Sequence, residues 1–329
     1  MKKKCGRPTA ICAFADYFKT KELRSGNCMP VCPSFAMQFL SKLECAATQL
    51  HNSGASLTAL RPRIEVEFSG SCLSETSKFT TVRHEKLALG AALAFDRDVL
   101  RQEPASIHFF DTEGRLVFLV VLEHLNRGVR LSNLLEEDEF IANRDGLTSC
   151  QTHPSRKTRA HSNRSWIPEA CRLNPEDPID FGDHLDSSFF DCGIARRCAL
   201  DNWSECSRRK VDKTKIAEIC HLLTDVRMPV RCCVSNTAIA QISEGAVCDT
   251  HVSKKMLRMS IGRATLSLSL DDIDDVSITT VNSLNGQVRS VEVYDWRCHL
   301  VARLTAATRE PNISAFWQSV TNNWAWTKN

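Results

Sequence analysis

Two stretches of the chain repeat one another at a constant spacing. Residues 106–117 read Ser-Ile-His-Phe-Phe-Asp-Thr-Glu-Gly-Arg-Leu-Val, and residues 290–301 read Ser-Val-Glu-Val-Tyr-Asp-Trp-Arg-Cys-His-Leu-Val. Serine, aspartate, leucine and valine recur at matching places, each 184 positions apart. Each copy has a β-branched and aromatic run, a turn after the aspartate and a second apolar run, which is typical of a β-hairpin.

Further identities lie upstream at a spacing of 175: Ile64 with Ile239, Gly70 with Gly245, Leu93 with Leu268, and Asp96 with Asp271. The change of spacing predicts a nine-residue insertion in the second copy, in the loop at 282–286. A chain of 329 residues has room for two such units. We therefore predict an α+β fold made of a tandem structural repeat, each half a mainly antiparallel β-sheet with flanking helices.

Helical periodicity and loop composition set the expected boundaries. Apolar stripes predict one helix from Ser34 to Leu50, a second that Asp212 caps and that includes Ile216, Ile219, Cys220 and Leu223, and a third after Ser314. Residues 143–180 are expected to be a linker, because the segment is rich in Ser, Thr, Asn, Pro and Arg. The first repeat then spans 1–142, with a loose tail at about 1–30, and the second spans 181–329.

Composition excludes several classes of protein. The formal charge of +3 and the missing aromatics around the basic linker argue against nucleic-acid binding, and no apolar run is long enough to span a bilayer. Gly6, Arg7 and Pro8 interrupt the segment after the first lysines, so we expect a cytoplasmic protein without an export signal. The 16 cysteines include no CxxC pair, which favours buried thiols over a zinc site.

Motifs of other enzyme classes are also missing. The sequence contains no phosphate-binding glycine loop, no GxSxG and no HExxH. The acidic run at 271–275 is expected to be a solvated turn, and the neighbouring Cys220 and His221 are not expected to form a nucleophile.

The two hairpins, with Ser-Ile-His-Phe-Phe-Asp-Thr-Glu-Gly in the first half and Ser-Val-Glu-Val-Tyr-Asp in the second, resemble the HemS/ChuS/HmuS family of bacterial haem-utilisation proteins, also called hemin-degrading factors. The resemblance covers about 60–122 and 183–317. It implies a cytoplasmic haem-binding protein that stores, traffics or degrades haem, with a haem-uptake transporter or a haem acceptor protein as further partners.

The resemblance also implies the site. Gly182-Asp183-His184-Leu185 matches the element whose histidine is the axial iron ligand, and Arg197, thirteen residues later, matches the arginine that binds a haem propionate. An imidazole is a good iron ligand, and a guanidinium holds a carboxylate through two hydrogen bonds. Lys255, with its neighbour Lys254, and Arg309 are further candidates for the propionates. The alternative is a solvated helix face at 183–197.

Departures from the family leave catalysis open. The repeat register puts Ala94 where the family has an arginine and Ser267 where it has a histidine, while His84 is interpreted as a surface residue. Oxidative haem degradation is therefore an open possibility. The competing hypothesis is a duplicated scaffold or interaction protein that has lost haem.

Overall fold

The fold is taken from a computed structural model of the chain. It describes residues 28–31, 33–40, 45–60, 64–68, 80–84, 89–95, 104–111, 114–122, 196–201, 206–236, 238–283, 286–308 and 310–323. Residues 1–27 of the predicted tail, the predicted linker, His184 and Arg309 lie outside these residues, whereas residues 28–30, expected in the tail, belong to a strand.

Strands dominate the described part of the chain. The first-half elements are β1 (Cys28–Val31), α2 (Pro33–Leu40), β2 (Cys45–His51), β3 (Ala55–Leu60), β4 (Ile64–Phe68), β5 (Thr80–His84), β6 (Leu89–Phe95), β7 (Ser106–Asp111) and β8 (Leu116–Leu122). The second-half elements are α5 (Arg196–Asp201), β9 (Cys206–Val211), α6 (Lys215–Asp225), β10 (Pro229–Ser235), β11 (Ile239–Val252), β12 (Met256–Ile261), β13 (Ala264–Ser269), β14 (Asp275–Ser283), β15 (Gly286–Tyr294), β16 (Leu300–Ala306) and α7 (Pro311–Asn323).

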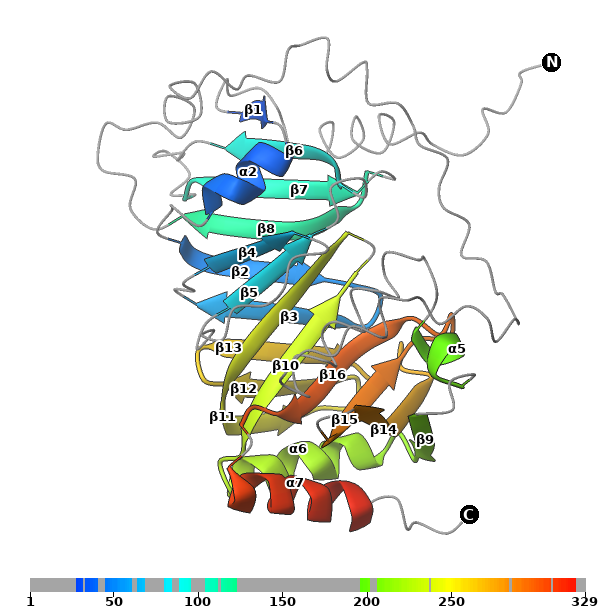
Figure 1. The fold of residues 1–329 in the computed structure, drawn as a ribbon. Coiled ribbons are helices and arrows are strands. Elements are labelled where there is room, and N and C mark those ends of the chain that lie inside the picture. The colour runs from blue at the N-terminus through cyan, green and yellow to red at the C-terminus, as the bar shows by residue number, and fades with distance from the viewer. Residues whose placement is uncertain are drawn as a thin grey trace, which may run out of the picture.

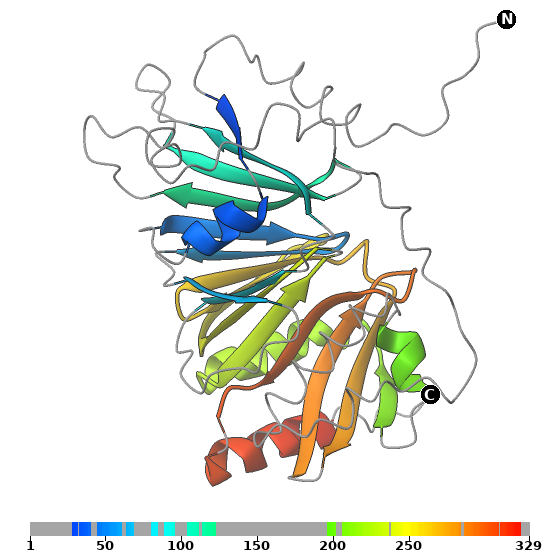
Figure 2. The ribbon, with the colours of Figure 1, turned by 45° about the horizontal axis from the view of Figure 1, so that its top comes forward.

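The strands form one continuous sheet path in which the two halves pair with each other. Its order is β1-β6-β7-β8-β2-β3-β13-β12-β11-β10-β16-β15-β14-β9, and β5 also pairs with β11. First-half β3 thus pairs with second-half β13, and first-half β5 pairs with second-half β11. Among the described pairings, all are antiparallel except β4 with β5. The mainly antiparallel sheet that the sequence predicted is therefore confirmed (Figures 1 and 2).

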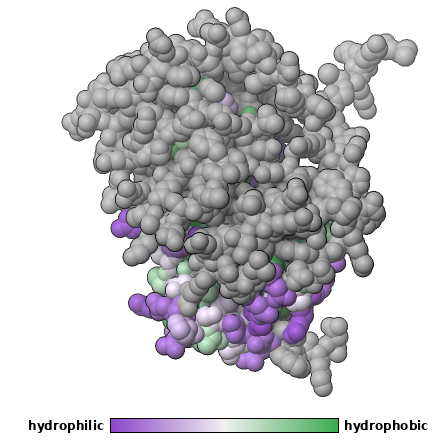
Figure 3. All heavy atoms as spheres, in the orientation of Figure 1, coloured by the Kyte–Doolittle hydropathy of each residue, from purple (hydrophilic) through white to green (hydrophobic). Residues whose placement is uncertain are grey.

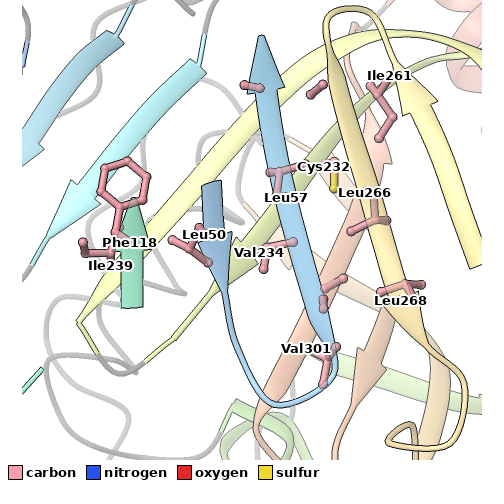
Figure 4. Close-up of a cluster of buried hydrophobic side chains, with 14 of the residues drawn as sticks. Leu50, Leu57, Phe118, Cys232, Val234, Ile239, Ile261, Leu266, Leu268 and Val301 are labelled. Carbon is pink, nitrogen blue, oxygen red and sulfur yellow. The ribbon is translucent and has the colours of Figure 1, made fainter. Parts of the chain in front are cut away.

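The apolar core runs through the junction of the halves. Alternation along β13 turns Ala264, Leu266 and Leu268 inward, as expected for a strand with one face in the core. Figure 4 shows Leu266 and Leu268 close to Leu57 of β3, with Phe118 and Leu50 nearby. Helices α6 and α7 lie at the far end of the second half (Figure 1), where hydrophilic residues are interspersed with some apolar ones on the visible surface (Figure 3).

The two predicted hairpins end in turns with the same hydrogen bonds. In the β7–β8 turn, the Asp111 carboxylate accepts the Arg115 backbone N–H at 2.9 Å, and Gly114 has φ 77°. In the β15–β16 turn, the Asp295 carboxylate accepts the His299 backbone N–H at 2.9 Å, and the residue with positive φ is Cys298, at 66°. Both predicted hairpins are therefore present, and their turns match at a spacing of 184.

A pair of asparagines with the same spacing ties the halves together. The Asn52 side-chain amide donates to the carbonyls of Ser235 and Val301, at 2.8 and 2.7 Å. The Asn236 amide donates back to the carbonyls of His51 and Val117, at 2.9 Å each. Each side-chain oxygen also accepts two backbone N–H groups of its own turn. These reciprocal contacts join the two halves of the chain.

The spacing of 175 and the insertion near 282–286 are wrong. Ser106 pairs with Phe95, and Ser290 pairs with Thr279, so both halves have the same strand spacing and β6 corresponds to β14 at 184. A spacing of 175 would match β13, which carries Leu268, with β6, but β6 pairs with the hairpin strand β7, whereas β13 pairs with β12 and β3. The two spacings differ by nine, an odd number, so the incorrect register also exchanges the two faces of a strand.

The helix predictions are confirmed in part. Helix α6 buries Ile216, Ile219, Cys220 and Leu223 as expected, and α7 buries Trp317. The Asp212 side chain accepts the Thr214 N–H at 2.9 Å just before α6, although Thr214 is the N-cap residue and makes no side-chain cap bond. The long helix from Ser34 is wrong beyond Leu40, because residues 45–51 form β2 between β3 and β8.

The described residues contain no helix that is both long and apolar enough to cross a membrane.

Candidate functional site

A row of polar side chains is buried on one face of the second-half sheet. Strands β14, β15 and β16 place Ser277 opposite Glu292 and Glu292 opposite Arg303, and all three are almost completely buried. Successive strand residues alternate between faces, so the intervening Val276, Val291 and other apolar side chains pack on the opposite face. The sheet therefore has an apolar face on one side and a buried polar face on the other.

Helix α5 closes this polar face with an ion pair. Its first residue, Arg196, is 5% exposed and lies with Nη2 2.7 Å from Oε1 of Glu292. Glu292 also accepts hydrogen bonds from the hydroxyls of Thr279, Ser290 and Tyr294. Burial raises the pKa of Glu292, but the Arg196 guanidinium and the hydroxyl donors outweigh it and lower the pKa to about 2. Glu292 is thus a carboxylate at neutral pH, and its charge fixes α5 on the sheet.

The next residue of α5 is the predicted propionate ligand, Arg197. Its side chain is 23% exposed, and Nη1 lies 3.4 Å from Asp274 and 3.6 Å from Asp275. These contacts are longer than the Arg196–Glu292 ion pair, and Asp274 is 51% exposed. Arg197 therefore lies at the solvent edge of the site with a loosely held guanidinium.

The acidic turn at 271–275 is only partly the solvated turn that the sequence predicted. Asp271 and Asp274 are exposed, but Asp275 is buried. Its Oδ2 accepts Arg208 Nη1 at 2.8 Å, and Arg208 also contacts Asp201 of α5 at 2.6 Å. Asp275 therefore holds the helix that carries Arg197, because Arg208 bridges the two.

The other predicted site residues divide into three groups. Lys255 is 79% exposed and lies 3.6 Å from Asp271, at the far end of the acidic turn that Arg197 contacts. His184 and Arg309 fall outside the described residues. Ala94 and Ser267 were matched to the family's arginine and histidine through the spacing of 175. The observed strand pairing does not support that spacing, so these two matches no longer hold.

The sequence reading missed Arg196 and Glu292, although both carried a signal. Ser290, Glu292 and Tyr294 occupy alternate positions of a strand, so their side chains share one face. A carboxylate in such a row, between apolar neighbours, needs a buried cation. The alternative of a solvated helix face at 183–197 is wrong for Arg196, whose guanidinium is buried against Glu292, while Arg197 contacts Asp274.

Alternative chemistries find no support in the described residues. Cys220 is buried, and burial raises the pKa of its thiol to about 12, so it is not a nucleophile at neutral pH. Within the part of the chain that the structure describes, no three His, Cys, Asp or Glu side chains gather as a metal site would need.

A comparison with protein families matches residues 193–324 to the family described as haemin-degrading HemS.ChuX domain. Residues 193–324 form a HemS/ChuX-type domain. This domain contains α5, the buried polar row and the acidic turn, whereas His184 precedes the matched segment. The resemblance noted in the hairpin sequences is confirmed for this half of the chain.

Solved structures extend the likeness beyond the HemS/ChuX-type domain. Holo-PhuS, a heme-binding protein from Pseudomonas aeruginosa, has a TM-score of 0.67 at 19% identity, covering 91% of this chain and 87% of its own. Apo-PhuS has a TM-score of 0.68 at 18% identity, covering 96% of this chain and 93% of its own. ChuS, described as an E. coli heme oxygenase, has a TM-score of 0.65 at 18% identity, covering 96% of this chain and 92% of its own. Both halves therefore share the fold of these proteins. No curated protein sequence matches the chain.

Proposed function

We propose that the chain binds haem and serves haem utilisation. The observation that carries the proposal is the HemS/ChuX-type domain around α5, in a chain with the fold of PhuS and ChuS along nearly its whole length. Haem would supply an iron centre that accepts an axial imidazole, and two propionates that need cationic partners.

The described residues fit a propionate at one point. Arg197 has contacts of 3.4 and 3.6 Å with two carboxylates, one of them on the exposed Asp274. A propionate can replace Asp274 at the guanidinium because the Asp274 carboxylate is half exposed and can be hydrated by solvent instead. Arg196 is unsuitable for this role, since its guanidinium is buried against Glu292. We propose that Arg197 holds a propionate, that His184 is the axial ligand, and that Lys255 and Arg309 are secondary contacts.

The role that we favour is storage or transfer of haem in the cytoplasm, with a haem acceptor or an uptake transporter as partner. A reducing compartment is consistent with buried thiols such as Cys220 and Cys232, which form no disulfide. Oxidative degradation is the second candidate, because one fold relative is described as a heme oxygenase. The third is a scaffold without haem.

We further propose that the chain arose by tandem duplication of one α+β unit, with repeats at 1–142 and 181–329 and a linker at 143–180. The equivalent turns at Asp111 and Asp295 support this proposal, as do the reciprocal contacts of Asn52 and Asn236.

A haem titration of the purified chain, followed by the Soret band, tests the proposed function. We expect His184→Ala to shift the band and weaken binding strongly, since it removes the coordinate bond to iron. Arg197→Ala should weaken binding about tenfold, the lower end of what a charge-assisted hydrogen bond contributes (about 1.5 kcal/mol). Arg258→Ala, which removes an exposed arginine of β12, is the matched control and should change nothing.

Two results would contradict this assignment. An unchanged spectrum and affinity in His184→Ala would mean that another residue ligates the iron. Failure of the unmodified chain to bind haem would favour the scaffold. If haem binds, adding ascorbate and oxygen separates storage from degradation, because only degradation bleaches the Soret band.

A further inference from the structure

The two carboxylates beside Arg197 differ in how freely they can leave it. Asp274 and Asp275 are neighbours in the chain, and Nη1 of Arg197 lies 3.4 Å from the first carboxylate and 3.6 Å from the second. The Asp274 side chain is 51% exposed, whereas the Asp275 side chain is fully buried. The guanidinium is therefore shared between one carboxylate in contact with solvent and one inside the protein.

Asp275 is held in place by groups other than Arg197. Its Oδ2 accepts hydrogen bonds from Nη1 of Arg208 at 2.8 Å and from the Ser277 hydroxyl at 3.2 Å. The residue also begins β14 and is paired with Tyr294 of β15. Separating a buried carboxylate from its cation is costly, so Asp275 stays beside Arg197 and keeps the guanidinium at the edge of the site.

Asp274 has a fixed backbone and a displaceable carboxylate. Its backbone N–H donates to the Tyr294 carbonyl at 2.9 Å, so the carboxylate leaves Arg197 by rotation of its own side chain, without movement of β14. Water hydrates the released carboxylate because the side chain is already half exposed. An ion pair with this much solvent contact contributes little free energy, and another carboxylate can take its place.

We propose that Asp274 is an internal competitor for the ligand's carboxylate and sets affinity and release at Arg197; this inference rests on the proposed function. In the ligand-free chain Asp274 occupies the guanidinium, and an incoming propionate displaces it. The displaced carboxylate remains on the same turn and repels the propionate, because like charges at short distance disfavour each other. The site therefore takes porphyrins that bring a free carboxylate, and Asp274 promotes their release.

Asp271 provides a comparison within the same turn. It lies 3.6 Å from Lys255, and the two side chains are 63% and 79% exposed. Solvent and salt screen a pair that is this exposed. Asp271 carries the same charge as Asp274 but pairs with a different cation. Removing its charge therefore measures the general electrostatic effect of the acidic turn, separately from competition at the Arg197 guanidinium.

Haem titrations of the full-length chain test the inference, with asparagine in place of either exposed aspartate. We expect Asp274→Asn to tighten haem binding by about two- to fivefold, the range expected for one exposed ion pair. Transfer of haem to an excess of apomyoglobin should slow by a similar factor. Asp271→Asn should stay close to the unmodified chain in both assays. In an Arg197→Ala background, Asp274→Asn should lose most of its gain, since no guanidinium remains to compete for.

The dimethyl ester of haem is the second probe. Its esterified propionates carry no charge, so it has no carboxylate to exchange with Asp274 at Arg197. Asp274→Asn should therefore leave the affinity for the ester unchanged while it raises the affinity for haem.

The outcomes separate the two levels of inference. If the unmodified chain binds no haem, the proposed function fails and the competitor role falls with it. If the chain binds haem but Asp274→Asn binds it no more tightly, the competitor role is overturned and the proposed function stands. An equal gain in Asp271→Asn, or an equal gain for the ester, also overturns the competitor role, because the effect would then come from the overall charge of the turn.

Discussion

Replacing Glu292 by glutamine tests whether the buried ion pair stabilises the second half. The substitution keeps the shape of the side chain but removes its charge, so Arg196, which is 5% exposed, loses its carboxylate partner. Removing one partner of a buried ion pair is costly and typically destabilises a protein by about 3–5 kcal/mol.

The pKa of Glu292 gives an independent magnitude. It falls from 4.5 to about 2 on folding, a difference of about 2.5 pH units at about 1.36 kcal/mol each, or roughly 3 kcal/mol. Because the folded-state pKa is the lower one, this contribution is fully present above about pH 5. It is lost as the pH falls towards 2, where the folded protein also takes up the proton.

The assay is urea unfolding followed by tryptophan fluorescence, since buried Trp317 reports on the second half. At pH 7 we expect Glu292→Gln to lower the free energy of unfolding by about 3 kcal/mol. Between pH 5 and pH 2 the two proteins should converge. Glu218→Gln is the matched control: Glu218 is 57% exposed and pairs with Lys215 on the surface of α6, so it should cost at most about 0.5 kcal/mol.

The reasoning is refuted if Glu292→Gln stays within 1 kcal/mol of the unmodified chain at pH 7, or if the difference between them does not shrink as the pH falls.

Three further predictions concern the frame around the site. Asn236→Ala, which removes two donated and two accepted hydrogen bonds, should lower the unfolding free energy by about 2–3 kcal/mol in the same assay. Gly245→Ala would put a methyl group 2.7 Å from the Gly262 backbone, so thermal unfolding should show a loss of about 1–3 kcal/mol; Gly54→Ala, which meets a side chain at 3.2 Å, should cost less. Limited proteolysis should cut first within 145–178 and leave two resistant fragments, and protection of that segment would contradict the linker.

The sequence predicted the elements whose pattern is local. The hairpin turns need an aspartate that accepts nearby N–H groups, and both aspartates do so. Helix α6 follows from its apolar stripe. The helix expected up to Leu50 was wrong because Leu50 lies on a strand paired on both sides, and pairing with distant strands outweighs a local helical pattern.

The register of the repeat was wrong because apolar identities are weak markers. Leu93 and Leu268 match in type, but leucine occurs on several other strands of the sheet, such as β2, β3, β8 and β16. The better marker was polar: His51-Asn52-Ser53-Gly54 and Ser235-Asn236-Thr237-Ala238 share the spacing of 184. Asparagine at a turn can cap the local backbone while its amide reaches another segment, which is how both residues are used here.

Part of the candidate site could not be predicted from local sequence at all. Arg196 and Glu292 are 96 residues apart, and only the sheet and α5 bring them together. Arg197 was identified through a family resemblance, but its carboxylate partners depend on the fold of the acidic turn.

The two halves carry different chemistry at equivalent positions. Glu292 corresponds at 184 residues to His108, and Ser290 corresponds to Ser106. His108 is nearly buried, contacts the Ser106 hydroxyl at 3.1 Å, and lies 4.6 Å from the ring of Phe95. A carboxylate that is ionised at neutral pH demands a buried cation such as Arg196, whereas a histidine beside an aromatic ring does not. Among the described residues, this ionic attachment of a helix is seen in the second half, where Arg196 of α5 pairs with Glu292. This asymmetry is a physical reason to expect one haem site on the second half rather than two related sites.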